Sequence, residues 1–358
     1  MRLVLTGQQE DLRTAVRDFL ADQAGPARVR EVLETADGFD RELWRRAGSE
    51  LGVLGLVVAE EHGGAGAGHV ERSVVAEELG ATLVPSPFLA SAVLAVDVLN
   101  AVDDIGMRER YLPPLAAGEL IGTVAHGAEA AERDGGWRLD GRLAPVISGD
   151  VADVVLVHAS TPDGTGWFAL DTTASGVRRT TLRTLDPTRR LARIDLAGAR
   201  ATRLDAADPD AVRSTADDLA AVALAAEQVG GMRRVLEMTT GYAEVRVQFG
   251  RRIGSYQGVK HALADLYGSW EQAVSVLRHA AWAADEAPDE LPVAAAVAQV
   301  FCAPAAFRAA ADGVVLHGGI GYTWEHDAHL YYKRAKTSEV LFGSERDRRL
   351  RLADLLGV

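Results

Sequence analysis

Residues 246–261 read Arg246-Val247-Gln248-Phe249-Gly250-Arg251-Arg252-Ile253-Gly254-Ser255-Tyr256-Gln257-Gly258-Val259-Lys260-His261. On both sides of this stretch apolar residues recur at three- and four-residue spacing, which predicts two long helices joined by it. Glycines let a backbone turn and approach a ligand closely, and Arg246 offers donors to an anion such as a diphosphate. From physics alone, an ordinary inter-helix loop with a solvated arginine explains these residues equally well.

Three zones of different periodicity extend outward from this stretch. The pattern is helical from Gln8 to about Gly118 and again from Asp210 onward. Between them, short β-leaning runs alternate with turn signals, which predicts a small antiparallel barrel or sandwich. The long alanine-rich helices that follow favour a four-helix-type bundle. We therefore expect an α+β protein with three domains, at residues 1–120, 121–208 and 209–358.

Composition excludes several classes of function. The chain has 358 residues and a formal net charge of -13, which is the wrong sign for a protein that binds nucleic-acid phosphates. The single cysteine, Cys302, excludes internal disulfides and cysteine zinc clusters and is typical of a reducing compartment. We find no signal-peptide pattern and no apolar run approaching the roughly 20 residues of a membrane span, so we expect a cytoplasmic protein without a membrane partner.

A second glycine-rich stretch lies near the C-terminus. It reads Leu316-His317-Gly318-Gly319-Ile320-Gly321-Tyr322-Thr323-Trp324-Glu325-His326-Asp327. Its glycines expose backbone amides that suit a phosphate or an adenine, although no βαβ unit surrounds them as in a Rossmann fold. The histidines of this region have no metal-ligand pattern, so we expect no metal site. A third stretch, Glu60-Glu61-His62-Gly63-Gly64-Ala65-Gly66, is a weak signal by itself.

Together, in this order and at these separations, the three stretches resemble the acyl-CoA dehydrogenase family. The resemblance implies an N-terminal helical domain, a central antiparallel β-barrel and a C-terminal four-helix bundle. It also implies an FAD held between subunits and α,β-desaturation of a fatty or steroid-side-chain acyl-CoA substrate. In that reaction a glutamate removes the α-proton and the β-hydrogen leaves as hydride to the flavin. An electron-transfer flavoprotein is the implied electron acceptor.

The resemblance also assigns cofactor contacts by position. In the family, the segments that match these two glycine-containing stretches reach across an interface to the diphosphate and adenosine part of a neighbour's FAD. Carried over, the cofactor-binding residues of this chain are Arg246, Phe249, Ile253, Gln257, His317, Gly318 and Gly319.

This sequence departs from the family where the catalytic base should be. One family position for the base is the glutamate of a Tyr-Glu-Gly-Thr loop. The equivalent segment here is Leu341-Phe342-Gly343-Ser344, and we place Gly343 at the glutamate position. The other position, on the first long helix of the bundle, falls on Ala220. Neither residue can accept a proton, so we assign no catalytic residue at these positions.

The segments that would hold the flavin ring and the substrate in this chain's own β domain also differ. The Thr-Glu-Pro-x-x-Gly-Ser-Asp segment expected after Gly122 is absent, and the Trp-Ile-(Thr/Ser) segment reads Val146-Ile147-Ser148. Family members hold the substrate with an Asp-x-x-Arg pair. Here the aspartate falls near Asp218, but Ala221 stands in place of the arginine. Much of the set that would reach a partner's FAD is kept, although Val315 replaces a glutamine often found three residues before the paired glycines. Most of the residues that would serve the chain's own site are lost, with Ser148 the exception in the Trp-Ile-(Thr/Ser) segment.

Three hypotheses follow. We favour a non-catalytic subunit that completes the FAD site of a homologous, base-carrying subunit, in an α2β2 assembly such as those of bacterial steroid side-chain degradation. The second is a self-sufficient homomer whose base has moved to Glu227 or Glu345. The third is a flavin-free scaffold paralogue. The sequence leaves the acyl chain and the direct electron acceptor open.

Overall fold

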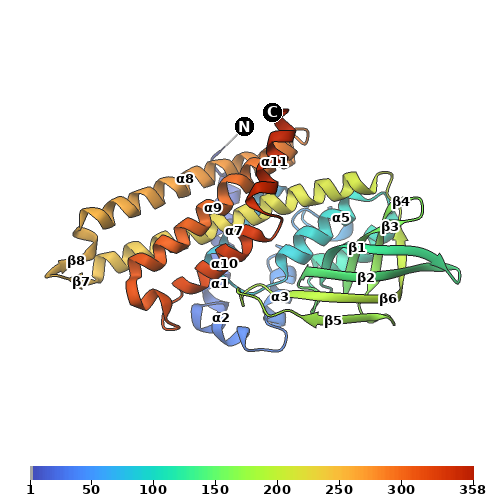
Figure 1. Cartoon of the computed structure of the whole chain (residues 1–358), viewed down its shortest axis with the longest axis horizontal. Helices are drawn as coiled ribbons and strands as arrows, with labels where there is room; N and C mark the ends of the chain where they lie inside the picture. The colour runs from blue at the N-terminus through green and yellow to red at the C-terminus, as the bar shows by residue number, and fades with distance from the viewer. Residues whose placement is uncertain (1–2) are drawn as a thin grey trace. The chain divides into compact units, whose positions relative to one another are not determined.

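The structure is a computed structural model that describes residues 3–358. Its chain order is helices, then a six-stranded sheet, then helices again (Figure 1). It divides into two compact units, one formed by residues up to 31, 69–84 and 221–358, and the other by residues 32–68 and 85–220. Both units combine segments far apart in sequence. The sequence-contiguous ranges 1–120, 121–208 and 209–358 therefore remain a prediction.

The first unit is helical apart from one small hairpin and short turns. It holds α1 (Gly7–Gln23), α4 (His69–Thr82), α8 (Gln257–Glu286), α9 (Leu291–His317), α10 (Ala328–Val340) and α11 (Glu345–Leu356), with most of α2 (Pro26–Leu33) and α7 (Pro209–Val245). The two long helices predicted on either side of residues 246–261 are thus confirmed as α7 and α8. Helix α9 packs against α8, α10 and α11.

The second unit contains the sheet. Its helices are α3 (Arg41–Ser49), a π-helical turn at Leu89–Ala95 that continues into α5 (Val96–Ala101), and α6 (Ile105–Ala116). Its strands are β1 (Gly122–Arg133), β2 (Gly136–Ile147), β3 (Val154–Thr161), β4 (Gly164–Asp171), β5 (Val177–Thr181) and β6 (Leu191–Leu204). The strand order is β2-β1-β3-β4-β6-β5, and β2 also pairs with β6. Fully buried Leu139, Leu143, Phe168, Leu170 and Ile194 form the centre of its core.

The expected purely antiparallel arrangement is wrong at one pair of strands. Strand β3 runs parallel to β1, with Gly122 opposite Val154. After β2 the chain returns through a short connection to the start of β1, where the amides of Asp153 and Val154 donate to the Ile121 carbonyl oxygen. Because β3 then begins beside the first residue of β1, the two strands must run in the same direction. The other pairings of this sheet are antiparallel.

Two glycines allow α4 and α7 to cross with their backbones in contact. A Cβ added at Gly230 of α7 would overlap the carbonyl oxygen of Glu77, and one added at Gly80 of α4 would overlap the carbonyl oxygen of Glu227. The obstructing atoms belong to the backbone, so a rotamer change cannot relieve either overlap. The crossing therefore requires glycine at both positions.

Arginines from three other helices surround two buried glutamates of α4. Glu78, which is 1% exposed, accepts hydrogen bonds from Arg233 of α7 and from Arg17 of α1. Glu77 pairs with Arg278 of α8. Burial alone would raise the pKa of Glu78, but the hydrogen bonds from Arg233 and Arg17 outweigh it and lower that pKa. These pairs connect α1, α7 and α8 to α4, and each buried charge has its partner.

Helix α9 corrects the expectation that no segment of this chain is apolar enough, over sufficient length, to span a membrane. Within residues 3–358, the segment Leu291–Tyr322 is long and apolar enough to cross a bilayer by length and composition. Half of its most apolar window is buried within the protein, and the helix packs against three other helices. Its buried residues are mostly alanines, including Ala294, Ala295, Ala298 and Ala309. We interpret α9 as a core helix of the first unit.

Candidate functional site

The 246–257 stretch forms a β-hairpin between α7 and α8 (Figure 1). Strand β7 (Val247–Gln248) pairs with β8 (Arg251–Arg252), and the amide of Ile253 donates to the Arg246 carbonyl oxygen over 2.8 Å. Phe249 and Gly250 form the two-residue turn with φ of +52° and +82°. Positive φ at both central residues is the geometry of a type I′ turn, which matches the twist of the two strands.

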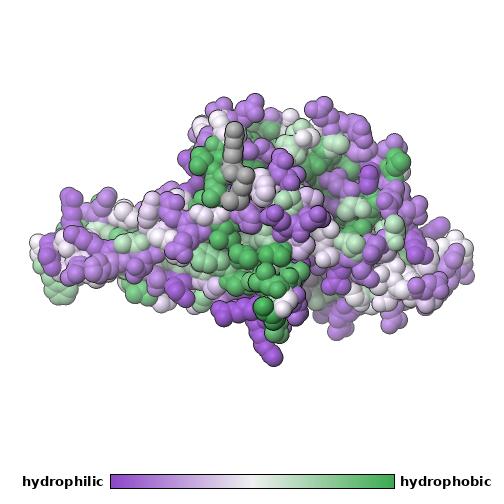
Figure 2. Space-filling view, turned by 90° about the horizontal axis from the view of Figure 1, so that it is seen from above, coloured by the Kyte–Doolittle hydropathy of each residue, from purple (hydrophilic) through white to green (hydrophobic). Residues whose placement is uncertain are grey.

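Phe249 occupies this turn at two costs. Its side chain is 94% exposed, so its apolar surface remains in water. Its left-handed backbone costs a residue with a Cβ roughly 1–2 kcal/mol, and asparagine or glycine is the usual occupant. Val247 beside it is also exposed, and hydrophobic and hydrophilic atoms lie together at the end of the unit that carries the hairpin (Figure 2). An exposed aromatic in a strained turn indicates a contact made outside this chain.

The hairpin is strongly cationic. Residues 246–261 contain three arginines and one lysine, with no aspartate or glutamate. Arg246, at its base, is exposed. Its side chain makes no hydrogen bond or ion pair within residues 3–358, whereas Arg251 lies over the ring of Tyr256 at 3.8 Å. The hairpin can therefore bind an anion through Arg246 without breaking an internal pair.

The second glycine-rich stretch follows α9 as a short 3₁₀ turn, Gly318–Tyr322. Gly318 has a φ of +67°, and the Cα atoms of Gly318 and Gly319 have open space around them. His317 is 3% exposed, and its Nδ1 lies 2.7 Å from the Gly313 carbonyl oxygen. Because a carbonyl only accepts, Nδ1 carries the proton, and a neutral ring then presents Nε2 as an acceptor. That buried Nε2 has no partner within residues 3–358.

Aromatic stacking brings the two stretches together. The His317 ring stacks on Tyr242 at 4.8 Å and lies 4.3 Å from His326. Tyr242 stands one turn before Arg246, whose amide donates to the Tyr242 carbonyl oxygen. Burial lowers the pKa of His326, with a further contribution from His317, so its Nδ1 can accept the Ala328 amide proton. Sequence reasoning considered His326 only as a metal ligand and missed Tyr242, for which the one-turn spacing from Arg246 was the available signal.

The other carried-over residues lie on the same hairpin or directly after it. Ile253 is half-buried in the 3₁₀ turn that follows β8, and exposed Gln257 begins α8 with its Nε2 3.4 Å from the His261 ring. The structure therefore places Arg246, Phe249, Ile253 and Gln257 on one connection. Stacking of His317 on Tyr242 adds the Gly318-Gly319 turn to the same end of the unit.

The position that we gave to Gly343 needs a correction. Gly343 has a φ of +100°, which glycine adopts readily, so it corresponds to the glycine of the Tyr-Glu-Gly-Thr segment. Residue-by-residue alignment then places Phe342 at the glutamate position. Ser344 follows as the N-cap of α11. Ala220, the other base position, is fully buried. Phe342 and Ala220 both lack a carboxylate, so neither family position supplies a catalytic base in this chain.

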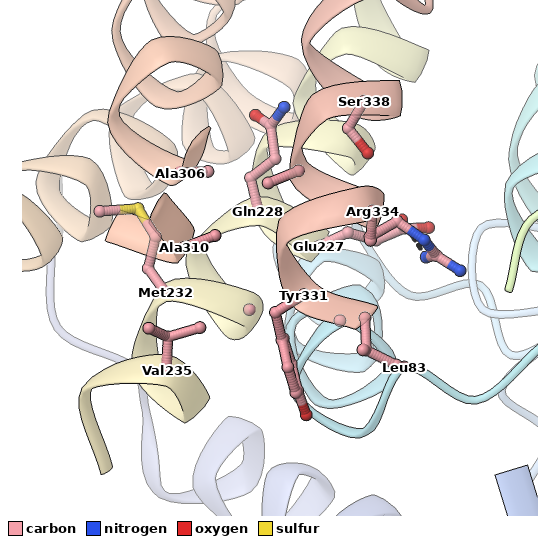
Figure 3. Close-up of a pocket in the computed structure, with 13 residues that line it drawn as sticks. Leu83, Glu227, Gln228, Met232, Val235, Ala306, Ala310, Tyr331, Arg334 and Ser338 are labelled. Carbon is pink, nitrogen blue, oxygen red and sulfur yellow. Dashed lines mark hydrogen bonds and ion pairs between the residues drawn. The ribbon is translucent and has the colours of Figure 1, made fainter. Parts of the chain in front are cut away.

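The two alternative bases occupy ordinary structural positions. Glu227 is 8% exposed and forms an ion pair with Arg334 of α10 at 3.3 Å, beside a cavity of about 20 Å³ (Figure 3). Glu345 is exposed in the first turn of α11 and pairs with Arg349. Each carboxylate is already engaged by a guanidinium, so it could remove a substrate proton only by giving up that ion pair.

We expect Glu227→Gln to leave turnover within about 3-fold of wild type, because Gln preserves shape and can still accept from Arg334. Glu345→Gln should behave in the same way. Steady-state turnover with a dye acceptor measures both. A loss of about 100-fold or more in either variant would identify that residue as the base.

The chain's own β domain places a histidine cluster in the region where the family's flavin-holding segment should begin. His126 of β1 contacts the rings of His158 and Trp167 edge-on, at 6.0 Å each. Burial lowers the pKa of His126 to about 4. Ser148, the remnant of the Trp-Ile-(Thr/Ser) segment, is 5% exposed with a φ of +52°. Within residues 3–358 no group of three or more His, Cys, Asp or Glu side chains is arranged to hold a metal ion.

Comparison with known proteins gives consistent matches over the whole chain. The family model for the acyl-CoA dehydrogenase N-terminal domain matches residues 6–119, and that for the C-terminal domain matches residues 214–356. Acyl-CoA dehydrogenase IpdE2 of Mycobacterium tuberculosis is 37% identical over 340 residues, covering 95% of this chain and 94% of that protein.

Two solved structures are similar as well. The ChsE4-ChsE5 complex from Mycobacterium tuberculosis contains a chain that is 32% identical, with a TM-score of 0.92 and coverage of 100% and 99% of the two chains. A variant of the Tcur3481-Tcur3483 steroid ACAD is 30% identical, with a TM-score of 0.89 and coverage of 98% of each chain.

This order of helices, a central sheet and further helices is shared along nearly the whole chain with the two solved structures, one of which is a steroid ACAD. The matches over both ends of the chain make the assignment specific. The chain belongs to the acyl-CoA dehydrogenase family, whose members are FAD-dependent oxidoreductases.

Proposed function

We propose that this chain is the non-catalytic subunit of a heteromeric acyl-CoA dehydrogenase and completes the FAD site of a homologous subunit that carries the base. The assembly we propose is α2β2, and its reaction is α,β-desaturation of an acyl-CoA. A steroid side-chain CoA thioester is the substrate we favour, because one similar structure is a steroid ACAD. An electron-transfer flavoprotein is the acceptor we propose.

The observation that carries this proposal is the exposure of Phe249 in a left-handed turn. An aromatic side chain that is 94% exposed, in a left-handed turn on a cationic hairpin, has no stabilising role within the chain. A partner surface would recover its burial energy. Similar chains in the ChsE4-ChsE5 and Tcur3481-Tcur3483 structures come from two-protein assemblies, which supports a partner of the same family.

The residues of the two stretches fit the adenosine diphosphate half of FAD. Arg246 is an unengaged guanidinium suited to a diphosphate, and the open Cα atoms of Gly318 and Gly319 admit a close ligand. The unpartnered Nε2 of His317 calls for a donor such as a hydroxyl or amino group. Phe249, Ile253 and Gln257 would complete this surface. Bound FAD would supply the hydride acceptor, while the partner's carboxylate would remove the α-proton.

Phe249→Asn tests whether the exposed aromatic side chain of Phe249 contacts a partner subunit. Asparagine tolerates the left-handed turn, so the lone chain should be unchanged or about 0.5–1 kcal/mol more stable. The complex should lose about 2 kcal/mol of binding free energy, or roughly 30-fold in affinity, because an exposed aromatic anchor is removed. Denaturant unfolding of the lone chain and surface plasmon resonance with the partner measure the two effects.

Leu185→Asn is the matched control, since Leu185 is 54% exposed and lies far along the chain on another unit. It should leave affinity for the partner unchanged. Unchanged affinity in Phe249→Asn would remove the support that this residue gives to the proposal.

The two alternatives have less support. A self-sufficient homomer would need Glu227 or Glu345 as base, and both are paired with arginines. A flavin-free scaffold would have no use for an unengaged Arg246 beside an exposed Phe249. A purified complex without flavin absorbance would favour the scaffold.

We also propose that the chain has three contiguous domains, at residues 1–120, 121–208 and 209–358. The pairing of β2 with β6 supports a closed β-barrel at residues 121–208, and the packing of α9 against α8 and α10 supports a bundle of α7, α8, α9 and α10 at residues 209–358. Residues 1–120 would form the N-terminal helical domain. We propose a cytoplasmic location, which the single buried Cys302 supports.

A further inference from the structure

The outer face of strands β2, β6 and β5 is rich in arginine. These three strands are neighbours in the sheet of the second unit (Figure 1). Side chains of a strand point alternately to its two faces, and Leu139, Leu143 and Ile194 point into the core. The arginines next to such core positions therefore lie on the opposite, outer face. They are Arg138 and Arg142 of β2, Arg193 and Arg200 of β6, and Arg178 of β5.

Three of these arginines share one carboxylate. Asp195 of β6 accepts from the Nε atoms of Arg142 and Arg193 over 3.0 Å each, and from Nη2 of Arg178 over 3.3 Å. Each guanidinium donates through a single nitrogen and makes no other hydrogen bond or ion pair within residues 3–358. The side chains of Arg142 and Arg178 are 69% and 74% exposed. The remaining donors of this cluster are therefore available to a second acceptor.

The other two arginines form a like-charge pair. Arg138 and Arg200 stand directly opposite each other in the register of β2 and β6. Neither has a carboxylate partner within the described residues, and Arg138 reaches only the Gly198 carbonyl oxygen, at 3.5 Å. Like charges directly opposite each other destabilise a sheet. Neither the stability of the sheet nor the composition, with 51 acidic against 38 basic residues, accounts for this pair.

The surrounding carboxylates do not neutralise this face. Asp140 of β2 points outward between the two groups of arginines and pairs with Arg133 of β1 over 3.2 Å. Glu129 of β1 lies opposite Asp140. With Asp195, three carboxylates therefore accompany six guanidinium groups. The excess is positive on a chain whose net charge is -13, which favours an anionic partner at this face.

The form and extent of the face select the kind of anion. Small-molecule sites are concave and bury most of their ligand, whereas Arg142 and Arg178 are mostly exposed. From Arg138 to Arg142 the arginines span roughly 13 Å along β2, at about 3.3 Å per residue. A nucleic acid or a membrane carries negative charge far beyond that span and would also meet the carboxylates around it. A short acidic segment of a protein fits the arginines alone.

We propose that the outer face of β2, β6 and β5 docks an acidic segment of a protein partner. One carboxylate of the segment binds at the Asp195 cluster, and another binds between Arg138 and Arg200, where it relieves the like-charge pair. The face belongs to the second unit, and residues 246–257 and 317–319 belong to the first. The docking is therefore independent of whether the chain completes a partner's flavin site.

Fluorescence anisotropy of labelled hexaglutamate with the full chain tests the proposal, with hexaserine as the uncharged probe. Hexaglutamate should bind at low salt, hexaserine should not, and raising NaCl from about 0.02 M to about 0.2 M should weaken binding at least 10-fold. The double variant Arg142→Gln/Arg200→Gln should lose at least 10-fold in affinity. Absence of hexaglutamate binding to the wild-type chain would overturn the proposal.

A matched control removes the same charge elsewhere on the second unit. Arg45→Gln/Arg110→Gln changes two exposed arginines of α3 and α6 and should bind hexaglutamate as wild type does. Equal weakening in this variant, or loss of binding in Arg246→Gln/Arg252→Gln on the hairpin, would place the peptide elsewhere and overturn the proposal. A short DNA duplex or phosphatidylserine vesicles that bind as tightly as hexaglutamate, through the same arginines, would overturn the choice of a protein segment.

Arg200→Glu separates docking from stability. It places a carboxylate opposite Arg138, so the denaturant midpoint of the lone chain should rise or stay unchanged. Hexaglutamate affinity should fall at least 10-fold in the same variant, because a donor is replaced by a like charge. Unchanged affinity in a folded Arg200→Glu chain would contradict the proposed docking.

Discussion

Arg246→Gln, assembled with the catalytic subunit, is expected to lose about 10- to 100-fold in FAD affinity. The guanidinium of Arg246 is exposed and unengaged within residues 3–358, so its donors are available to a diphosphate. Hydrogen bonds to charged groups contribute about 1.5–3 kcal/mol each, which sets the size of the effect. Fluorescence titration of the flavin-depleted complex with FAD measures it.

Arg252→Gln is the control for the Arg246 experiment. Arg252 lies on the same hairpin and its loss changes the net charge equally, but it does not match a motif position that contacts cofactor. A loss of FAD affinity shared by both variants would indicate a general charge effect. A loss in neither variant would show that the hairpin does not bind the diphosphate. The stability of the lone chain should be unchanged in both, because neither side chain is buried.

Gly230→Ala is expected to destabilise the chain by about 3 kcal/mol or more. The added methyl would overlap the carbonyl oxygen of Glu77, and only a shift of α4 against α7 can relieve that overlap. Such a shift would also disturb the Glu78–Arg233 pair, which depends on the same crossing. Denaturant unfolding followed by circular dichroism measures the change.

Gly231→Ala is the matched control for this crossing. It makes the same change one residue later on α7, where the nearest backbone atom, the Gly80 carbonyl oxygen, lies 3.8 Å from the added Cβ. Alanine favours helix over glycine by about 1 kcal/mol, so this variant should be equally or more stable than wild type. Equal destabilisation of both variants would contradict the steric explanation.

Local patterns predicted most of the secondary structure. Apolar spacing located α7 and α8 on either side of the hairpin, and turn signals separated the strands of the central zone. Strand direction was not predictable in the same way. Whether β3 runs parallel to β1 depends on the path of the chain after β2, and that path is fixed by pairing between Ile121 and Asp153, which local sequence does not encode.

In the candidate site, too, the sequence predicted residues but not the contacts between them. Motif spacing identified Arg246, Phe249 and His317, but not that His317 stacks on Tyr242, because that contact joins helices α7 and α9. The exposure of Phe249 also follows from the three-dimensional hairpin and not from its composition. The register of the altered base loop was available from the sequence, because Leu-Phe-Gly-Ser matches Tyr-Glu-Gly-Thr residue by residue with Phe342 at the glutamate, and the positive φ of Gly343 agrees with that match.

The most direct test of the central claim is the flavin content and turnover of the purified chain, alone and with a homologous acyl-CoA dehydrogenase subunit that carries the base. Flavin absorbance relative to protein gives the content, and dye-linked oxidation of an acyl-CoA gives the turnover. The account predicts no turnover by the lone chain, and an active complex with a single FAD for each pair of unlike subunits. A lone chain that carries stoichiometric FAD and turns over acyl-CoA would contradict it.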